Sequence, residues 1–134
     1  IYERYKEGLK GLPVSMNPFD GETSEPNFWL SCMIIDPEAM CKQVRGECEA
    51  LYVSEPGKSC PTEILEAIAA INAEGRPIWK PMHMQPVFAG CDYIDNGKVG
   101  ETLFRRGVCL PSDTKMTDED LERICGVIRG LWKK

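Results

Sequence analysis

The sequence predicts an α+β fold, in which helices pack on a small and mostly antiparallel sheet. Short apolar stretches of strand length alternate with amphipathic stretches of helix length, and few of the connections have the length of a plain βαβ crossover. The 134 residues suit one domain with one core. The strongest strand candidate, residues 28–35, is nearly continuously apolar, which favours burial on both faces with helices covering at least one of them.

The first element is predicted to be a helix. Ile1, Tyr5 and Leu9 recur four residues apart with charged residues between them. The helix should end near Gly8 or Gly11, because glycine favours helix ends. The pattern begins at the first residue with no N-cap residue before it. We therefore expect the sequence to be part of a longer chain.

The middle of the sequence is predicted to hold two strands, at residues 14–19 and 28–35. Residues 37–44 are expected to form a short helix after Asp36–Pro37 ends the second strand. Residues 45–59 contain Gly46, Pro56, Gly57 and several charges, and we expect an exposed excursion there.

The second half opens with a helix at Pro61, because proline is tolerated in the first helical turn. Its apolar stripe is expected to hold Ile64, Leu65, Ile68 and Ile71. Gly75 stands where a left-handed C-cap would belong. Residues 76–79 should be extended, and residues 80–86 should form a loop punctuated by proline.

The last three elements are predicted to be a helix at residues 99–106, a short strand at 108–110 and a C-terminal helix. The first of these helices would place Val99 and Leu103 on one face. Thr117 can cap the final helix, with Asp120 in the matching position of a capping-box variant. The buried stripe of that helix should consist of Leu121, Ile124, Cys125, Ile128 and Trp132.

Net charge and apolar run lengths exclude several classes of protein. The formal net charge is −5 and the pI is about 5.0, so the overall field repels phosphate backbones and disfavours nucleic-acid binding. No apolar run is long enough to cross a bilayer, and we expect no membrane partner. No secretion signal is visible, which disfavours a disulfide framework; reduced thiols then indicate a cytoplasmic protein.

The seven cysteines are expected to be reduced thiols. None forms a CxxC pair, and His83 is the only histidine, so no metal site is predicted. We expect Cys32, Cys109 and Cys125 to be buried, and Cys48 and Cys60 to be more accessible.

Residues 76–88, RPIWKPMHMQPVF, form the most unusual stretch of the sequence. Its prolines stiffen an irregular backbone. Arg76, Lys80 and His83 bring a guanidinium, an ammonium and the imidazole together, a set that suits an anionic ligand. The alternative is structural: Trp79 and Met82 pack while Arg76 and Lys80 are solvated, or Arg76 pairs with a carboxylate and His83 only supports the loop.

No catalytic residue is predicted within the chain. A Cys–His nucleophile would have to use Cys91, the thiol nearest in sequence to His83. Neither of the glycine-rich phosphate-binding patterns is present. The acidic residues Asp118, Glu119 and Asp120 lie in the first turn of the last helix, where support of the helix dipole is the simpler role.

Three blocks of sequence together resemble one enzyme family. These are RPIWKPMHMQPVF at residues 76–88, LFRRGVCLPSDTKMTDEDLERI at 103–124 and FWLSCMIID at 28–36. They are similar, in order, to the C-terminal portion of the DegT/DnrJ/StrS family of sugar aminotransferases, and in particular to enzymes that aminate 4-keto nucleotide sugars for surface glycans. The 45–59 excursion looks longer than in many relatives, which leaves the sugar open.

The resemblance implies the C-terminal small domain of the aspartate-aminotransferase architecture, fold type I. It implies pyridoxal phosphate as cofactor, held in a large domain that precedes this chain, and a homodimer. The partners would be a nucleotide-diphosphate sugar and an amino-acid donor, glutamate. Lys80 and Lys115 do not match the motif of the Schiff-base lysine, so the chain alone is expected to be inactive and to bind no cofactor.

The same resemblance favours His83, Arg76 and Lys80 as substrate-binding residues. The other hypothesis is a free-standing module that binds a sugar nucleotide or a protein without catalysis.

Overall fold

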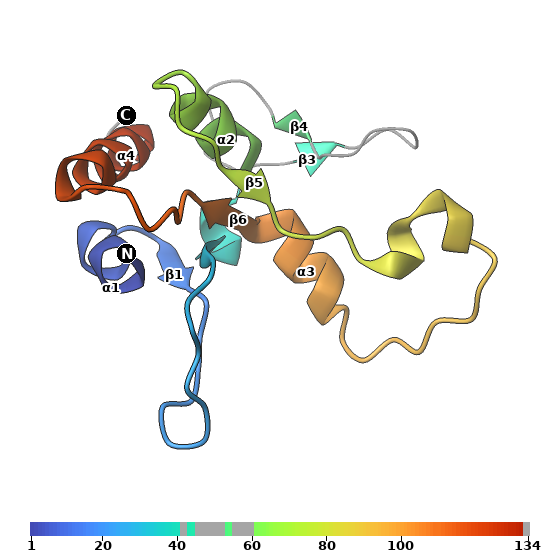
Figure 1. Cartoon of the computed structure of the whole chain (residues 1–134). Helices are drawn as coiled ribbons and strands as arrows, with labels where there is room; N and C mark the ends of the chain where they lie inside the picture. The colour runs from blue at the N-terminus through green and yellow to red at the C-terminus, as the bar shows by residue number, and fades with distance from the viewer. Residues whose placement is uncertain (41–42, 45–52, 55–60, 133–134) are drawn as a thin grey trace.

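A computed structural model describes residues 1–40, 43–44, 53–54 and 61–132. Its centre is a four-stranded antiparallel sheet with the strand order β1-β2-β6-β5 (Figure 1). The strands of this sheet are β1 (Val14–Met16), β2 (Ser31–Ile35), β5 (Arg76–Pro77) and β6 (Gly107–Leu110). The α-helices are α1 (Tyr2–Gly8), α2 (Pro61–Ala69), α3 (Val99–Arg106) and α4 (Asp118–Leu131). The expected α+β class with an antiparallel sheet is confirmed.

One face of the sheet and three helices build the core. Met33, Ile35, Val108 and Leu110 of the two central strands pack against α1, α2 and α4, which contribute Tyr5, Ile64, Ile68, Leu121, Ile124 and Ile128 among others. Fully burying one such aliphatic side chain stabilises the fold by about 1.5–3 kcal/mol. The core therefore lies on one side of the sheet, and α3 approaches β2 and β6 separately from it (Figure 1).

Strand β2 is shorter and less buried than the sequence predicts. It begins at Ser31, because Phe28 has a φ of 48° that breaks the extended backbone, and Trp29 is 72% exposed. Within β2 the buried residues Ser31, Met33 and Ile35 alternate with half-buried ones. The face of β2 opposite the core, near α3, is therefore only half-buried. Full burial of β2 on both faces was a wrong expectation.

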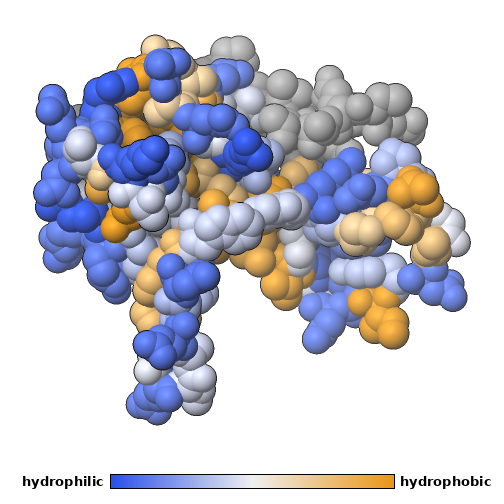
Figure 2. Space-filling view, in the orientation of Figure 1, coloured by the Kyte–Doolittle hydropathy of each residue, from blue (hydrophilic) through white to orange (hydrophobic). Residues whose placement is uncertain are grey.

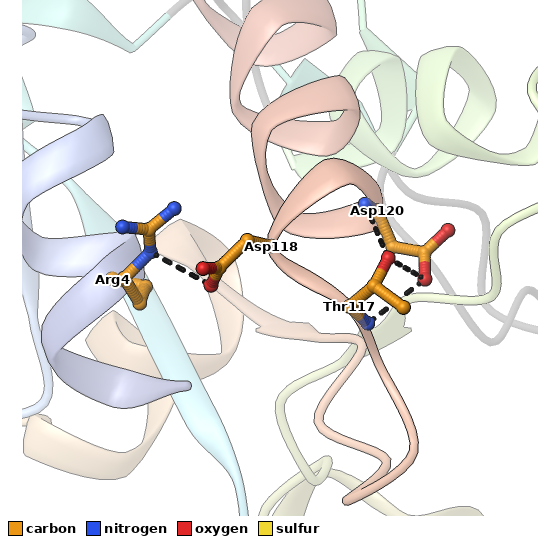
Figure 3. Close-up of polar contacts among 4 residues, drawn as sticks. All are labelled: Arg4, Thr117, Asp118 and Asp120. Carbon is orange, nitrogen blue, oxygen red and sulfur yellow. Dashed lines mark hydrogen bonds and ion pairs between the residues drawn. The ribbon is translucent and has the colours of Figure 1, made fainter.

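Helices α1 and α4 pack closely through a glycine. A Cβ atom on Gly8 would lie 2.7 Å from the Sγ of Cys125, so a larger side chain there would push the two helices apart. The Arg129 guanidinium also donates a hydrogen bond to the Gly8 carbonyl at 2.9 Å. Arg4 and Asp118 add a 3.3 Å ion pair between the exposed sides of the same helices (Figure 3).

The N-terminus of α4 has the predicted capping box. The Asp120 N–H donates to the Thr117 hydroxyl at 3.2 Å, and the Asp120 carboxylate accepts from the Thr117 N–H at 2.9 Å (Figure 3). These bonds satisfy two backbone donors that would otherwise have no partner. They also hold the pKa of Asp120 below its usual value.

The end of α2 differs from the prediction. Asn72, with a φ of 61°, takes the left-handed conformation after the helix, and Gly75 does not. Gly75 is instead required by close packing. A Cβ atom there would lie 2.4 Å from Cδ1 of Ile68 and 3.2 Å from the Cys109 carbonyl oxygen.

The short helix expected at residues 37–44 is wrong in its extent. Only Pro37–Ala39 form a 3-10 turn, and Met40 returns to an extended backbone. Gln43–Val44 form strand β3, which pairs with β4 (Val53–Ser54). Apart from β4, the excursion at 45–59 lies outside the described residues.

Residues 80–98, which we call the arm, project away from the sheet between β5 and α3 (Figure 1). The arm contains the 3-10 turns Met82–Met84 and Pro86–Phe88, and none of its residues is buried. Its outer part exposes apolar side chains (Figure 2), including Val87 at 77% and Ile94 at 94%.

Helix α3 has the predicted bounds, but Phe104 is its buried residue while Val99 is exposed.

Candidate functional site

A cavity of about 420 Å³ lies where β5 leaves the sheet. Arg76 and Lys80 border it together with Trp79, and Phe104 of α3 and Cys109 of β6 form part of its wall. Most of the lining is apolar, while the two cations come from the segment of β5 and the residues after it. The carboxylate of Glu74 also borders the cavity. Apolar walls with a few charged groups are typical of a site for a small organic ligand.

Arg76 is exposed and already has a carboxylate partner. Its Nη2 and Nε lie 2.8 and 3.0 Å from Oε1 of Glu74. A surface pair of this kind contributes little to stability and exchanges readily with water. The guanidinium has five donors, so others remain for a ligand in the cavity.

Lys80 is half-buried beside the same cavity. Its carbonyl oxygen accepts a hydrogen bond from the Gln85 amide at 3.4 Å, which ties the first residue of the arm to the turn at residues 82–84. Among the described residues, no carboxylate forms an ion pair with its ammonium group.

His83 lies apart from the two cations. Its Nε2 is 3.0 Å from Oε1 of Glu101 on α3, and its ring stacks on Tyr93 with the centroids 3.7 Å apart. The side chain is 17% exposed, and it does not border the 420 Å³ cavity. The structure therefore brings Arg76 and Lys80 to one cavity. His83 instead joins the first part of the arm to Tyr93 in its last part and to Glu101 of α3.

Sequence reasoning missed the partners of these residues. Glu101 and Tyr93 hold His83, Glu74 pairs with Arg76, and Trp29 lies near Trp79 with 6.5 Å between the ring centroids. Only the closeness of Glu74 to Arg76 in sequence could have signalled any of them. The other partners come from segments that only the folded chain brings together.

The thiols of the described residues are unbridged. Cys109 and Cys125 are buried as predicted, and burial raises the pKa of the Cys125 thiol. Cys32 is only half-buried, because it lies on the face of β2 opposite the core. Cys48 and Cys60 lie outside the described residues. Within the described part of the chain, no three metal-ligating side chains are grouped so as to hold an ion.

None of the described lysines is buried in this structure. An imine-forming lysine needs a desolvated site or a cationic neighbour that lowers its pKa. Four of the described lysines are exposed and Lys80 is half-buried; the exposed ones are Lys6, Lys10, Lys98 and Lys115.

Among the described residues, no helix is both long and apolar enough to cross a membrane.

Comparison with known proteins gives a consistent family match. The model of the DegT/DnrJ/EryC1/StrS aminotransferase family matches residues 1–129. EpsN of Bacillus subtilis (strain 168), which is named as a pyridoxal phosphate-dependent aminotransferase, is 41% identical over 98% of the chain. A GDP-perosamine synthase of Vibrio cholerae is 23% identical over 98% of the chain. The chain spans only 30% and 31% of these two relatives.

Solved structures share the fold. DesI, determined in the presence of its TDP-sugar product, superimposes with a TM-score of 0.70 at 18% identity, over 96% of this chain and 28% of its own. A DegT DnrJ EryC1 StrS aminotransferase from Brucella abortus gives a TM-score of 0.69 at 21% identity, over 99% and 30%. These neighbours have the fold type I architecture that the sequence predicted. Fold, motifs and family match agree, and the chain belongs to the DegT/DnrJ/EryC1/StrS aminotransferase family.

Proposed function

We propose that this chain is the C-terminal small domain of a pyridoxal-phosphate-dependent aminotransferase that passes an amino group from glutamate to a 4-keto nucleotide sugar for surface polysaccharide synthesis. The family match over residues 1–129 carries the proposal. The chain has about 30% of the length of its relatives, so the activity belongs to the whole enzyme.

The nucleotide-sugar class is supported by the names of the relatives. GDP-perosamine synthases and DesI with its TDP-sugar product both handle sugars on nucleoside diphosphates. A diphosphate requires cationic groups at its binding site. The cavity beside β5 offers Arg76 and Lys80 in a protein that is acidic overall.

The cofactor is proposed to be bound outside this chain. Pyridoxal phosphate would supply the amino-transfer chemistry when bound. No described lysine here is buried, which supports binding of the cofactor by a preceding large domain and not by this one. The isolated chain would then bind no cofactor and be inactive.

Substrate binding is proposed for Arg76, Lys80 and His83. Arg76 and Lys80 would contact the diphosphate from the cavity. When Nε2–H of His83 donates to Glu101, Nδ1 of the neutral ring is left to accept a hydrogen bond from a sugar hydroxyl, and donation from Nδ1 to a phosphate oxygen requires the doubly protonated ring. The prolines of residues 77–86 reduce the conformational entropy that is lost when the segment is ordered around a ligand.

The complete enzyme is proposed to be a cytoplasmic homodimer. Trp29, Trp79, Val87 and Ile94 are all more than half exposed in this chain. Large apolar side chains of this kind are commonly covered by another domain or subunit. The unbridged thiols fit a reducing compartment.

The test is to map the cofactor in the complete protein. The protein is reduced with borohydride, digested, and searched for a phosphopyridoxyl-lysine peptide. We expect one labelled lysine, outside residues 1–134, whose imine absorbance is discharged by glutamate and restored by a 4-keto nucleotide sugar. A label on Lys80 or Lys115 would contradict the proposal that the cofactor is bound outside this chain. A protein with no label that still binds nucleotide sugars would be a binding module.

A further inference from the structure

Two thiols face each other across the central strands of the sheet. Cys32 of β2 is directly opposite Cys109 of β6 in the register of the two strands. Their Sγ atoms lie 3.6 Å apart in a thiol–thiol hydrogen bond. Both side chains stand on the face of the sheet opposite the core, so neither helps to fill it.

The backbone geometry at this position favours a cross-strand bond. The N–H of Cys32 donates to Oδ1 of Asn17, and its carbonyl oxygen accepts from the Asn17 N–H. Both groups therefore point toward β1 and away from β6. Cys32 and Cys109 form a non-hydrogen-bonded pair, for which the Cα atoms are about 4.5 Å apart. That separation lies within the range for disulfides, about 4.4–6.8 Å.

The two thiols differ in reactivity. The hydrogen bond between the two thiols lowers the pKa of Cys32, the more accessible of them, while the same bond and burial raise the pKa of Cys109. The thiolate is the reactive form of cysteine. Cys32 is only half-buried whereas Cys109 is buried, so the thiol with the lowered pKa is also the more accessible one.

We propose that Cys32 and Cys109 form an oxidation site for hydroperoxides that closes a reversible cross-strand disulfide. The Cys32 thiolate attacks the O–O bond, the alcohol or water leaves, and Cys32 becomes a sulfenic acid. The Cys109 sulfur then attacks the Cys32 sulfur and releases water. In total, two thiols and ROOH give one disulfide, ROH and H₂O, and a dithiol reductant reverses the change.

Oxidation would alter one wall of the cavity beside β5. Cys109 borders that cavity and lies opposite Arg76 in the register of β5 and β6. Its thiol also contacts the Pro77 carbonyl oxygen at 3.9 Å. Drawing its sulfur toward Cys32 changes this contact. The effect on ligand binding depends on the proposed function, whereas the oxidation itself does not.

The test is peroxide oxidation of the complete protein followed by peptide mapping. Trypsin places Cys32 in residues 11–42 and Cys109 in residues 107–115. Cys41 shares the first peptide, so the experiment uses the Cys41→Ser background. We expect hydrogen peroxide to join these two peptides, and dithiothreitol to release them.

Two variants identify the order of events. In Cys109→Ser, the sulfenic acid on Cys32 has no partner, and labelling of Cys32 by dimedone should rise at least several-fold. Cys91→Ser, which removes an exposed thiol, should leave the cross-link unchanged. Oxidation of Cys32 to sulfinic acid without a cross-link would overturn the proposal. An unreacted Cys32 beside an oxidised Cys91 would overturn it equally.

Discussion

The body of the domain and the arm at residues 80–98 are held by different forces. The body rests on a continuous core of buried side chains from the sheet, α1, α2 and α4. The arm has no buried residue, and its order comes from prolines, two 3-10 turns and the contacts of His83. The body therefore provides stability, whereas the arm exposes apolar and polar side chains and borders the cavity through Lys80.

The largest effect should come from the body. Ile68→Ala removes a side chain that is fully buried in the core and packs against Gly75. We expect the free energy of unfolding to fall by about 2–5 kcal/mol, as for other buried Ile-to-Ala changes. Val87→Ala in the arm, 77% exposed, should change it by less than about 0.5 kcal/mol. Urea denaturation of the two variants tests the comparison, and equal losses would contradict it.

An intermediate effect is expected at the cap of α4. Thr117→Ala removes the side-chain bonds of the capping box and should lower the free energy of unfolding by about 0.5–2 kcal/mol. The Thr117 bonds also hold the pKa of Asp120 below its usual value. The bonds to the ionised Asp120 carboxylate contribute fully to the free energy of unfolding at pH values above the usual pKa of an aspartate. This contribution is lost as the pH falls through the lowered pKa of Asp120. The difference in free energy of unfolding between wild type and Asp120→Asn, measured by denaturation at neutral and acidic pH, should therefore be smaller at acidic pH.

The smallest effect on global stability is expected where the arm meets α3. Tyr93→Ala removes the ring that stacks on His83, yet the core does not include this contact. We expect a change in unfolding free energy below about 0.5 kcal/mol, with faster amide hydrogen exchange within residues 80–98 only. Faster exchange in β2 or α4 as well would show that the arm and the body are one cooperative unit.

The sequence predicted the features set by local pattern better than those set by tertiary contacts. The capping box of α4 and the bounds of α3 follow from local pattern, and both were confirmed. The end of α2 was wrong because Gly75 is selected by contact with Ile68, a matter of tertiary packing. The start of β2 was wrong because Phe28 adopts a positive φ that its sequence does not reveal.

The candidate site shows the same limit. The composition of residues 76–88 indicated Arg76, Lys80 and His83 as a set, and two of them do border one cavity. Glu101 is eighteen residues from His83, and Cys32 is seventy-seven from Cys109. No periodic pattern links such pairs, since the fold alone brings them together.

The central claim is that residues of this domain bind the nucleotide-linked keto-sugar. It is tested most directly by the variants Arg76→Ala and His83→Ala in the complete enzyme. Each should lower kcat/KM for the keto-sugar about ten- to a hundred-fold, because one charge-assisted contact contributes about 1.5–3 kcal/mol. The half-reaction with glutamate should remain close to that of wild type, as should both half-reactions of Val87→Ala. Wild-type kinetics toward the sugar in both variants would contradict the account and leave the segment with a structural role.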